Sequence, residues 1–457
     1  MCTGGRIRIR GIVQGVGFRP YVYALACELG IRGTVKNLGS EVEILAAGPR
    51  FGEFLDRISK GPPLSRIDEV QVDPLPGPVP DGFSILPSGE GALSGMIPPD
   101  VATCVDCIRD IDNPQGRYGG YWATSCVNCG PRYSIIEKLP YDRERTSMAV
   151  FPLCGGCLAE YRDPASRRHH AQTIACPSCG PVLTLYDAYG KSIALADPVA
   201  EAARLLDAGK ILGVRGIGGF HLACIEESAG ELKRRLGRTE QPFAVMVKAD
   251  AVHSFAVAGP PEWDALSSPE RPIVVLPKLK HDLHREISNL HTIGIMLPYT
   301  GLHHLLFDRL AHPLLVMTSA NMPGYPMITG LAEMTARMHG QVDFFLDHNR
   351  RIVNRCDDSV VRDGLIIRLS RGMAPKRTAL PLGGECILGI GPELNSNITI
   401  YRDGHTITSP HVGNVRNPKT LSYLQETVEN LSRLTGAEFD VIAHDLHPQF
   451  LSTRYAA

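Results

Sequence analysis

The sequence predicts a multidomain protein of mixed α/β and α+β class, and three observations lead to this prediction. The chain has 457 residues, which is enough for about three or four domains. Strand-like and helix-like segments alternate near the N-terminus and again between residues 198 and 380. Between these two regions lie four C-x-x-C pairs, a spacing that indicates metal binding in a chain without a secretion signal.

Composition narrows the classes of function. Hydrophobic residues make up 44% and charged residues 21% of the chain, as in ordinary globular proteins. The formal net charge of -1 gives no overall field that would favour nucleic acid or an anionic membrane, so we expect neither as a partner. No apolar run approaches the ~18 residues needed to span a bilayer, and the first residues lack the apolar core of a signal peptide. We therefore expect a cytoplasmic protein.

Residues 4–91 are expected to form a ferredoxin-like domain with the element order βαββαβ. Proline and glycine bound its first predicted helix, as is typical of helix ends. The predicted strands are residues 6–13, 31–37, 41–47, 66–73 and 83–86, and the predicted helices are residues 20–29 and 49–60.

The stretch "GIVQGVGFRP", residues 11–20, indicates an anion site between the first strand and the first helix. Its glycines let backbone N–H groups turn inward, and the helix N-terminus adds partial positive charge. Arg19 is a cation where the helix dipole disfavours one, which is easier to explain if a phosphate lies between the two. Asn37, at the end of the next strand, could hold an attacking water. The alternative is a plain tight turn with a solvated arginine.

This stretch resembles the acylphosphatase signature G-x-V-Q-G-V-x-F-R almost residue for residue. The resemblance implies that Arg19 binds the phosphate of an acyl phosphate and that Asn37 positions the water. Such a substrate is a mixed anhydride, so positioning and charge stabilisation would supply most of the catalysis.

The cysteines form an internal repeat with a constant offset of 50 residues. Each copy, residues 104–129 and 154–179, has the pattern C-x-x-C, eighteen residues, C-x-x-C, which is typical of a closed four-cysteine zinc site with a structural role. We therefore expect two Zn²⁺ ions. Disulfides, redox dithiols and Fe–S ligation are the competing interpretations, and the spacing leaves open which pairs share an ion. The predicted ligands are Cys104, Cys107, Cys126, Cys129, Cys154, Cys157, Cys176 and Cys179.

The sequence "RRHH", residues 167–170, lies inside the second copy and allows two interpretations. One is a nucleic-acid contact. The other, which the near-zero net charge favours, is a basic turn that is solvated or faces a phosphate.

Residues 198–380 are expected to form an α/β domain with a nucleotide phosphate site at its strand ends. Basic residues are usually solvated, and Ser and Asn are usually turn formers, so each candidate alone is weak. Together, and above all through "TSAN" and "SRG", they resemble the YrdC-like domain, whose members make carboxy- or carbamoyl-type adenylates from ATP. The resemblance implies an ATP pocket, with Mg²⁺, lined by Lys210, Arg215, Arg238, Ser319, Asn321, Ser359 and Arg371. Leu236 and Gln241 stand where the family usually has lysines.

Residues 386–457 resemble the start of an ASKHA-type (actin-like ATPase) carbamoyl-transfer domain, through "ILGIGPELNSN", "HVGN" and "HDLHP". The resemblance implies a further metal site with His444 and His447 as ligands and Asp445 beside them. The alternative is a histidine pair in an ordinary turn. Asn414 is neutral where the family has an acid.

The four modules in this order resemble the hydrogenase-maturation carbamoyltransferases of the HypF type. The resemblance implies that carbamoyl phosphate and ATP yield carbamoyl adenylate, and that the carbamoyl group passes to the C-terminal cysteine of a HypE-type maturation protein as a precursor of the cyanide ligand of NiFe hydrogenase. Members of the family are longer, so we expect a truncated chain that keeps the acylphosphatase and adenylation steps and lacks autonomous transfer. The alternatives are a tRNA threonylcarbamoyl-adenylate synthase-like enzyme and a non-catalytic remnant.

Overall fold

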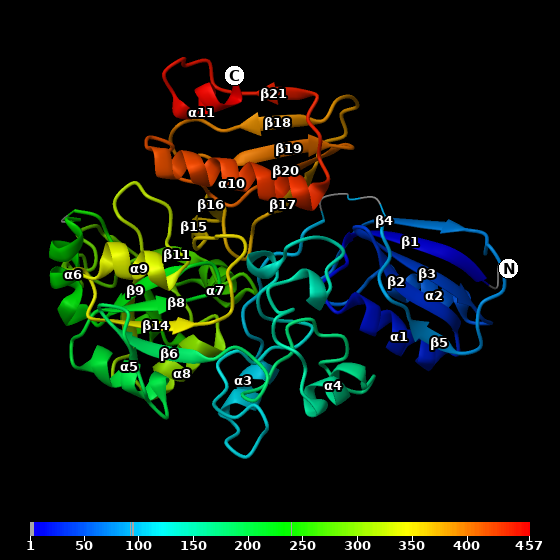
Figure 1. The fold of residues 1–457 in the computed structure, drawn as a ribbon, viewed down its shortest axis with the longest axis horizontal. Helices are drawn as coiled ribbons and strands as arrows, with labels where there is room; N and C mark the ends of the chain where they lie inside the picture. Colours follow the sequence, from blue (N-terminus) through cyan, green and yellow to red (C-terminus); the bar gives the residue numbers. More distant parts are fainter. Residues whose placement is uncertain (1–3, 92, 94–95, 239) are drawn as a thin grey trace.

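The protein consists of three sheet-based domains around an irregular cysteine-rich segment, which we define as residues 96–181 (Figure 1). The structure is a computed structural model, and it describes residues 4–91, 93, 96–238 and 240–457. The blue N-terminal domain and the green-to-yellow domain lie on opposite sides of the cysteine-rich segment, which carries α3 and α4. None of the described helices is long and apolar enough to cross a bilayer.

The N-terminal domain confirms the predicted βαββαβ order, and the strand predicted at residues 83–86 forms an edge of the sheet. Its sheet has the order β4-β1-β3-β2-β5, with β5 parallel to β2 at one edge. Both helices bury their apolar side chains against one face of the sheet, where Ile7, Ile44 and Phe54 are completely buried. The elements are β1 (Gly4–Ile12), α1 (Phe18–Leu29), β2 (Arg32–Leu38), β3 (Glu41–Ala47), α2 (Phe51–Ile58), β4 (Arg66–Asp73) and β5 (Phe83–Ile85).

The first helix begins two residues earlier than predicted, directly after the glycine-rich loop. Gly17, with φ 74°, is the N-cap, and Pro20 therefore lies inside the first turn, where a backbone N–H has no partner in the helix. The helix ends as predicted at Gly30, which has φ 64°. The early start places Arg19 on the first turn.

In the cysteine-rich segment, the two copies of the repeat fold alike and bind each other reciprocally. Helix α3 (Val105–Asp112) follows the first cysteine of copy one, and α4 (Gly155–Arg162) follows that of copy two. Arg117 of the first copy pairs with Glu160 of the second, and Arg167 of the second pairs with Asp110 of the first. Each pair joins positions that the 50-residue offset makes equivalent, so the two copies form a pseudo-symmetric unit.

The large domain is built on an eleven-stranded mixed sheet of order β16-β15-β11-β12-β10-β13-β9-β8-β14-β6-β7. Its first two strands, β6 and β7, form a hairpin that precedes residue 198, the predicted start of this domain. The strands are β6 (Leu183–Asp187), β7 (Ser192–Ile193), β8 (Leu212–Arg215), β9 (Phe220–Cys224), β10 (Ala244–Val247), β11 (Ile273–Pro277), β12 (Thr292–Met296), β13 (Leu314–Ser319), β14 (Phe344–His348), β15 (Val360–Arg362) and β16 (Leu365–Arg368). The helices are α5 (Pro198–Asp207), α6 (Ala229–Leu236), α7 (Pro260–Ser267), α8 (Gly301–Arg309) and α9 (Leu331–Met338).

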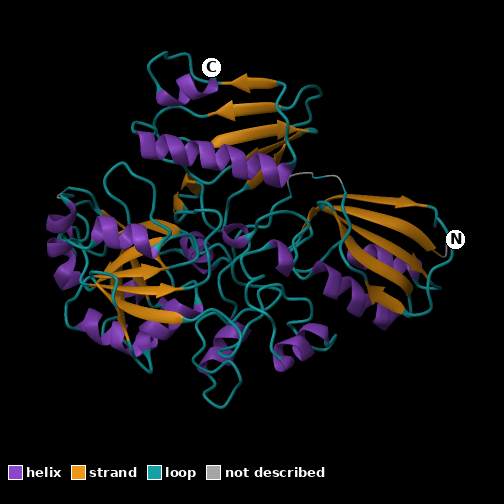
Figure 2. Ribbon diagram, viewed as in Figure 1, coloured by secondary structure: helices purple, strands orange, loops and turns teal. Residues whose placement is uncertain are grey.

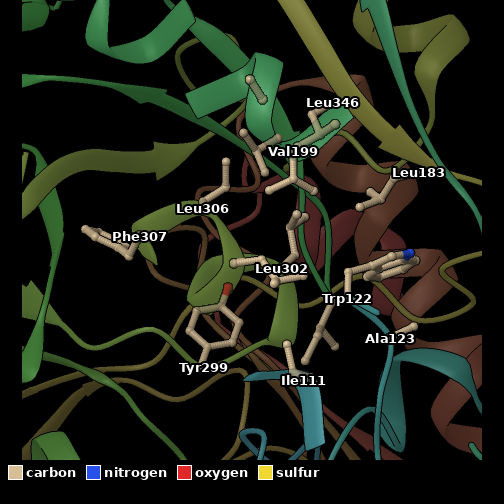
Figure 3. Packing of buried hydrophobic residues seen from close by; sticks show 14 of the residues in the cluster. Ile111, Trp122, Ala123, Leu183, Val199, Tyr299, Leu302, Leu306, Phe307 and Leu346 are labelled. Atoms are coloured by element: carbon tan, nitrogen blue, oxygen red, sulfur yellow. The ribbon is translucent and has the colours of Figure 1, made fainter. Parts of the chain in front are cut away.

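One hydrophobic core joins the cysteine-rich segment to the large domain (Figure 3). Ile111 of α3 and Trp122 lie beside Leu302 of α8 and Val199 of α5. The Trp122 ring also stacks on His348 at 4.6 Å between centroids, and its Nε1 donates to the carbonyl of Pro181. The first copy of the repeat is therefore packed into the large domain.

The C-terminal domain has a five-stranded sheet of order β17-β20-β19-β18-β21 with α10 along one face (Figure 2). Its core also takes in Tyr133, Ile136 and Leu139 of the cysteine-rich segment. The elements are β17 (Lys376–Ala379), β18 (Ile387–Ile390), β19 (Ile398–Arg402), β20 (His405–Thr408), α10 (Pro418–Thr435), β21 (Val441–Ala443) and α11 (Leu451–Ala456).

Arg132 attaches the N-terminal domain to the cysteine-rich segment, and its guanidinium is surrounded by backbone carbonyls. Its side chain is buried, and Nε donates to the carbonyl of Gly15 in the glycine-rich loop at 2.6 Å. Nη1 donates to the carbonyls of Cys129 and Pro131, and Nη2 donates to those of Val127 and Cys126. One side chain thus fixes the glycine-rich loop against the second C-x-x-C pair.

We predict that Arg132→Met lowers the thermal midpoint by roughly 5–10 °C, because it leaves several buried carbonyls without donors. Circular dichroism melting measures this shift. Arg109→Met is the control, since the Arg109 side chain is 76% exposed and should change the midpoint little. Equal midpoints for Arg132→Met and the wild-type chain would contradict the role of Arg132.

Candidate functional site

The glycine-rich loop and the start of α1 form a small cavity whose opposite wall comes from the cysteine-rich segment. Gly15 (φ 69°) and Gly17 (φ 74°) are in the left-handed region, and a Cβ on either would come within 3.1 Å of the cysteine-rich segment. The backbone N–H groups of residues 15–17 donate to no acceptor among the described residues. These donors, at a helix N-terminus, can bind the oxygens of a phosphate.

Arg19 lines this cavity, whereas Asn37 is not among its lining residues and is connected to Arg19 through residues 88 and 89. The Arg19 side chain is buried, and its guanidinium donates to Asp142 Oδ1 at 3.0 Å and to Ser88 Oγ at 3.2 Å. Asn37 is 1% exposed, and neither its amide nitrogen nor its amide oxygen has a partner among the described residues. The backbone N–H of Gly89, next to Ser88, donates to the Asn37 carbonyl. The segment at residues 88–89 therefore touches both predicted catalytic residues.

The sequence did not connect Asp142 or His170 with Arg19. Both lie more than a hundred residues after Arg19, and the packing of the cysteine-rich segment pairs Asp142 with Arg19 and places His170 among the lining residues of the cavity. The turn at residues 167–170 was predicted to be solvated or to face a phosphate, and solvation is wrong for Arg168, which is 5% exposed and pairs with Asp110. His170 of the same turn does line the cavity with Arg19.

The eight predicted cysteine ligands form two clusters, each within one copy of the repeat. Neighbouring Sγ atoms are 3.5–3.8 Å apart, as between Cys126 and Cys129 or Cys157 and Cys179. Four thiolates at ~2.3 Å from a tetrahedral zinc ion would be about 3.8 Å apart, so both clusters fit zinc. All described cysteines are free, so the disulfide interpretation is not supported, and each copy closes on itself.

Each cluster receives hydrogen bonds from the other copy. Arg117 Nη2 of the first copy donates to Cys157 Sγ at 2.6 Å and to Cys154 Sγ at 3.4 Å. Arg168 of the second copy lies 4.0 Å from Cys107 Sγ. Positive groups beside thiolates stabilise the charged, metal-binding form.

A second cavity of about 330 Å³ lies between the large domain and the C-terminal domain. Three of the seven predicted ATP-pocket residues line it and bind one another. Arg238 Nη2 donates to the backbone carbonyl of Asn321 at 2.6 Å, and Ser319 Oγ donates to Asn321 Oδ1 at 3.1 Å. Gln241 also lines this cavity, whereas Leu236 is buried in the core of the large domain.

The structure does not bring the other four predicted residues to this cavity. Arg215 is paired with Asp347 at 2.9 Å, and Arg371 is paired with Asp358 at 2.7 Å, both inside the protein. Ser359 is buried and donates to the Arg371 carbonyl. Lys210 is exposed beyond the end of α5.

The C-terminal domain supplies the other wall of the second cavity, including Asn395, His411 and Asn414. The Asn414 side-chain oxygen accepts a hydrogen bond from the Asn395 backbone N–H at 2.9 Å. Burial and the nearby guanidinium of Arg368 lower the pKa of His411 to about 4, so this ring is neutral at pH 7.

His444 and His447 lie outside both cavities and both metal clusters. Both side chains are exposed, and His447 stacks on Phe450 at 4.2 Å between ring centroids. His444 Nδ1 bonds to the Asp445 carbonyl. Within the described part of the chain, the groups that could hold a metal ion are the two cysteine clusters alone.

Fold and sites together define a multidomain protein in which a glycine-rich cradle (residues 13–20), two four-cysteine knuckles and a large mixed sheet are packed into one unit. Four family models match the chain: acylphosphatase at residues 5–85, "HypF finger" at 103–136 and 153–186, "Telomere recombination" (Sua5/YciO/YrdC) at 204–370, and "HypF Kae1-like domain" at 383–457. The chain belongs to the HypF family.

Individual relatives agree with this assignment along the whole chain. Carbamoyltransferase HypF of Rhodobacter capsulatus is 40% identical over 99% of the chain, and probable carbamoyltransferase HypF of Methanocaldococcus jannaschii is 46% identical over 99%. A crystal structure of full-length HypF in the phosphate- and nucleotide-bound form superposes on 99% of the chain with a TM-score of 0.94 and 38% identity. The chain covers 62%, 61% and 61% of these three proteins, or about three fifths of their length.

We predict that the purified chain contains two zinc ions, and that Cys107→Ser and Cys157→Ser each reduce this number to one. Each substitution removes one of four thiolates from a single cluster. Inductively coupled plasma mass spectrometry measures the metal content. Cys27→Ser is the control, because Cys27 is exposed and far from both clusters in sequence. Retention of both ions in the Cys107 and Cys157 variants would contradict the assignment.

Proposed function

We propose that this chain hydrolyses carbamoyl phosphate at the cavity around Arg19. The observation that carries the proposal is Asn37, whose buried amide has no partner among the described residues. An unpaired buried amide costs about 1–3 kcal/mol, and such groups are usually satisfied by a bound water or ligand. A phosphate in the cavity and an attacking water held by the Asn37 amide would complete this site.

The proposed reaction needs no covalent intermediate. Phosphate oxygens accept hydrogen bonds from the loop N–H groups and from Arg19, and Asn37 orients a water toward the phosphorus. The water oxygen forms a bond to phosphorus while the bond from phosphorus to the carbamoyl oxygen breaks. Phosphate and carbamate leave, and the water proton passes to solvent.

We expect Arg19→Ala and Asn37→Ala to lower kcat/KM for phosphate release from carbamoyl phosphate by about 10²–10³-fold, because each removes a group aimed at the reacting phosphate or water. Colorimetric detection of phosphate, corrected for spontaneous decomposition, measures the rate. Arg32→Ala is the matched control, since the Arg32 side chain lies in the same domain and is 56% exposed. A wild-type rate in both site variants would overturn the proposal.

At the second cavity we propose that ATP, with Mg²⁺, binds and reacts with the carbamate to give carbamoyl adenylate. Arg238, Ser319 and Asn321 support this, since they form one connected polar wall at the end of β13. The HypF relative whose structure is described as nucleotide-bound has the same fold over the shared length. In this proposal the carbamoyl group then passes to the C-terminal cysteine of a HypE-type protein, and the two zinc ions have a structural role.

The proposed compartment is the cytoplasm. Eight thiolates must stay reduced to hold two metal ions, and a reducing compartment provides this condition.

For the second cavity we expect Arg238→Met to weaken ATP binding about tenfold, because a charge-assisted hydrogen bond to phosphate contributes about 1–3 kcal/mol. Gln241→Lys, which adds a positive charge to the cavity wall, should strengthen binding severalfold at low ionic strength. Isothermal titration calorimetry measures both. Arg234→Met is the control, since the Arg234 side chain is 73% exposed. Pyrophosphate release from ATP that requires threonine instead of carbamoyl phosphate would contradict the proposed adenylation.

A further inference from the structure

The second copy of the cysteine repeat has a histidine in a backbone conformation for which the first copy uses glycine. Gly120 and His170 are equivalent by the 50-residue offset, with φ values of 66° and 53°. Each donates its backbone N–H to the residue nine positions earlier, Gly120 to Ile111 at 2.8 Å and His170 to Tyr161 at 2.9 Å. The left-handed conformation costs a residue with a Cβ about 1–2 kcal/mol. A strained histidine at a position that accepts glycine indicates a functional constraint.

The His170 ring lies at the cavity that contains Arg19. The ring is held between Tyr161 and His169, at 4.9 Å and 4.7 Å between centroids. Its nitrogens make no hydrogen bond within the described part of the chain. Burial and the positive charge of Arg19 lower the pKa of His170 to about 4, so the ring is neutral at pH 7 and one nitrogen carries a free lone pair.

The other polar groups on this wall are already engaged. The Gln172 amide nitrogen donates to the His170 carbonyl at 2.7 Å, and its oxygen accepts from the Arg143 backbone N–H at 2.8 Å. Asp142 does not line the cavity, and its Oδ1 accepts from the Arg19 guanidinium. Among the described side chains that line this wall, the His170 ring therefore offers a nitrogen acceptor that no hydrogen bond occupies.

The wall lies outside the part of the chain that matches the acylphosphatase family, which ends at residue 85. A substrate whose phosphate binds at the loop can direct its acyl end toward this wall, because the loop and the wall line the same cavity. Carbamoyl phosphate carries an amino group at that end, whereas acetyl phosphate carries a methyl group of nearly the same size. Only the amino group can donate a hydrogen bond.

We propose that His170 is a specificity-determining residue that accepts a hydrogen bond from the amino group of carbamoyl phosphate and so selects this substrate over acyl phosphates with a methyl group there. The inference rests on the proposed hydrolysis at Arg19 and adds its selectivity. Acetyl phosphate would place a methyl group, which cannot donate, against this ring nitrogen, and sites built to bind an N–H group reject analogues that lack it. Asp142 is a positioning residue, since it acts through Arg19.

The experiment compares kcat/KM for carbamoyl phosphate and acetyl phosphate in the full chain and in three variants. His170→Gly relieves the left-handed backbone and removes the acceptor, and His170→Asn tolerates the same backbone while offering an amide oxygen. We expect His170→Gly to lower the carbamoyl-to-acetyl ratio about tenfold or more, almost wholly through carbamoyl phosphate, and His170→Asn to retain a larger part of the ratio. Asp142→Asn should change both substrates by the same factor. Unchanged zinc content and thermal midpoint show that the variants fold.

Three outcomes overturn the inference. An unchanged ratio in His170→Gly, or an equal loss for both substrates, would leave the proposed hydrolysis intact and remove the role of His170. If Asp142→Asn changed the carbamoyl-to-acetyl ratio and His170→Gly did not, the selectivity would belong to Asp142 and not to His170. A wild-type chain that releases phosphate from neither compound would overturn the proposed hydrolysis as well.

Discussion

The buried guanidinium of Arg132 makes the contact on which the geometry of the glycine-rich cradle depends. It donates both to the backbone carbonyl of Gly15 in the cradle and to carbonyls of the turn between Cys126 and Cys129. Those carbonyls point inward because both cysteines turn toward one metal cluster. A metal ion that touches no substrate would thus hold the turn, the turn would hold Arg132, and Arg132 would hold the loop. Close packing then forces glycine at residues 15 and 17, so the sequence of the loop reflects this contact as well as anion binding.

The duplicated cysteine repeat shows how a symmetric scaffold can serve two unlike neighbours. The reciprocal pairs Arg117–Glu160 and Arg167–Asp110 keep the two copies in one relative arrangement. The positions after them have diverged. In the first copy, Trp122 is packed into the core of the large domain, whereas its equivalent in the second copy, Gln172, lines the cradle. Equivalent positions therefore attach one copy to the large domain and place the other at the cavity beside the glycine-rich loop.

Local spacing was enough to predict the features whose residues are close in sequence. The glycine-rich loop, the βαββαβ order and the cysteine repeat all follow from patterns shorter than one domain. Long-range pairing was the obstacle elsewhere. Arg215 stands at a strand end, as a phosphate ligand would, yet its guanidinium is paired with Asp347, more than a hundred residues later. Arg371 is likewise paired with Asp358. A single sequence also cannot place the wall of the cradle, because the Arg19–Asp142 contact spans two domains.

The charge of the second cavity bears on the residues that depart from the family pattern. Arg238, Arg355 and Arg368 line it together with one acid, Asp357, and its histidine is neutral at pH 7. The cavity therefore keeps an excess of positive charge without a lysine at position 241. Leu236 is buried in the core, so a lysine there would meet apolar side chains instead of a phosphate unless the helix moved. Gln241 and Asn414 both line the cavity, so the first departure removes a positive charge from the field that a nucleotide would meet and the second removes a negative charge.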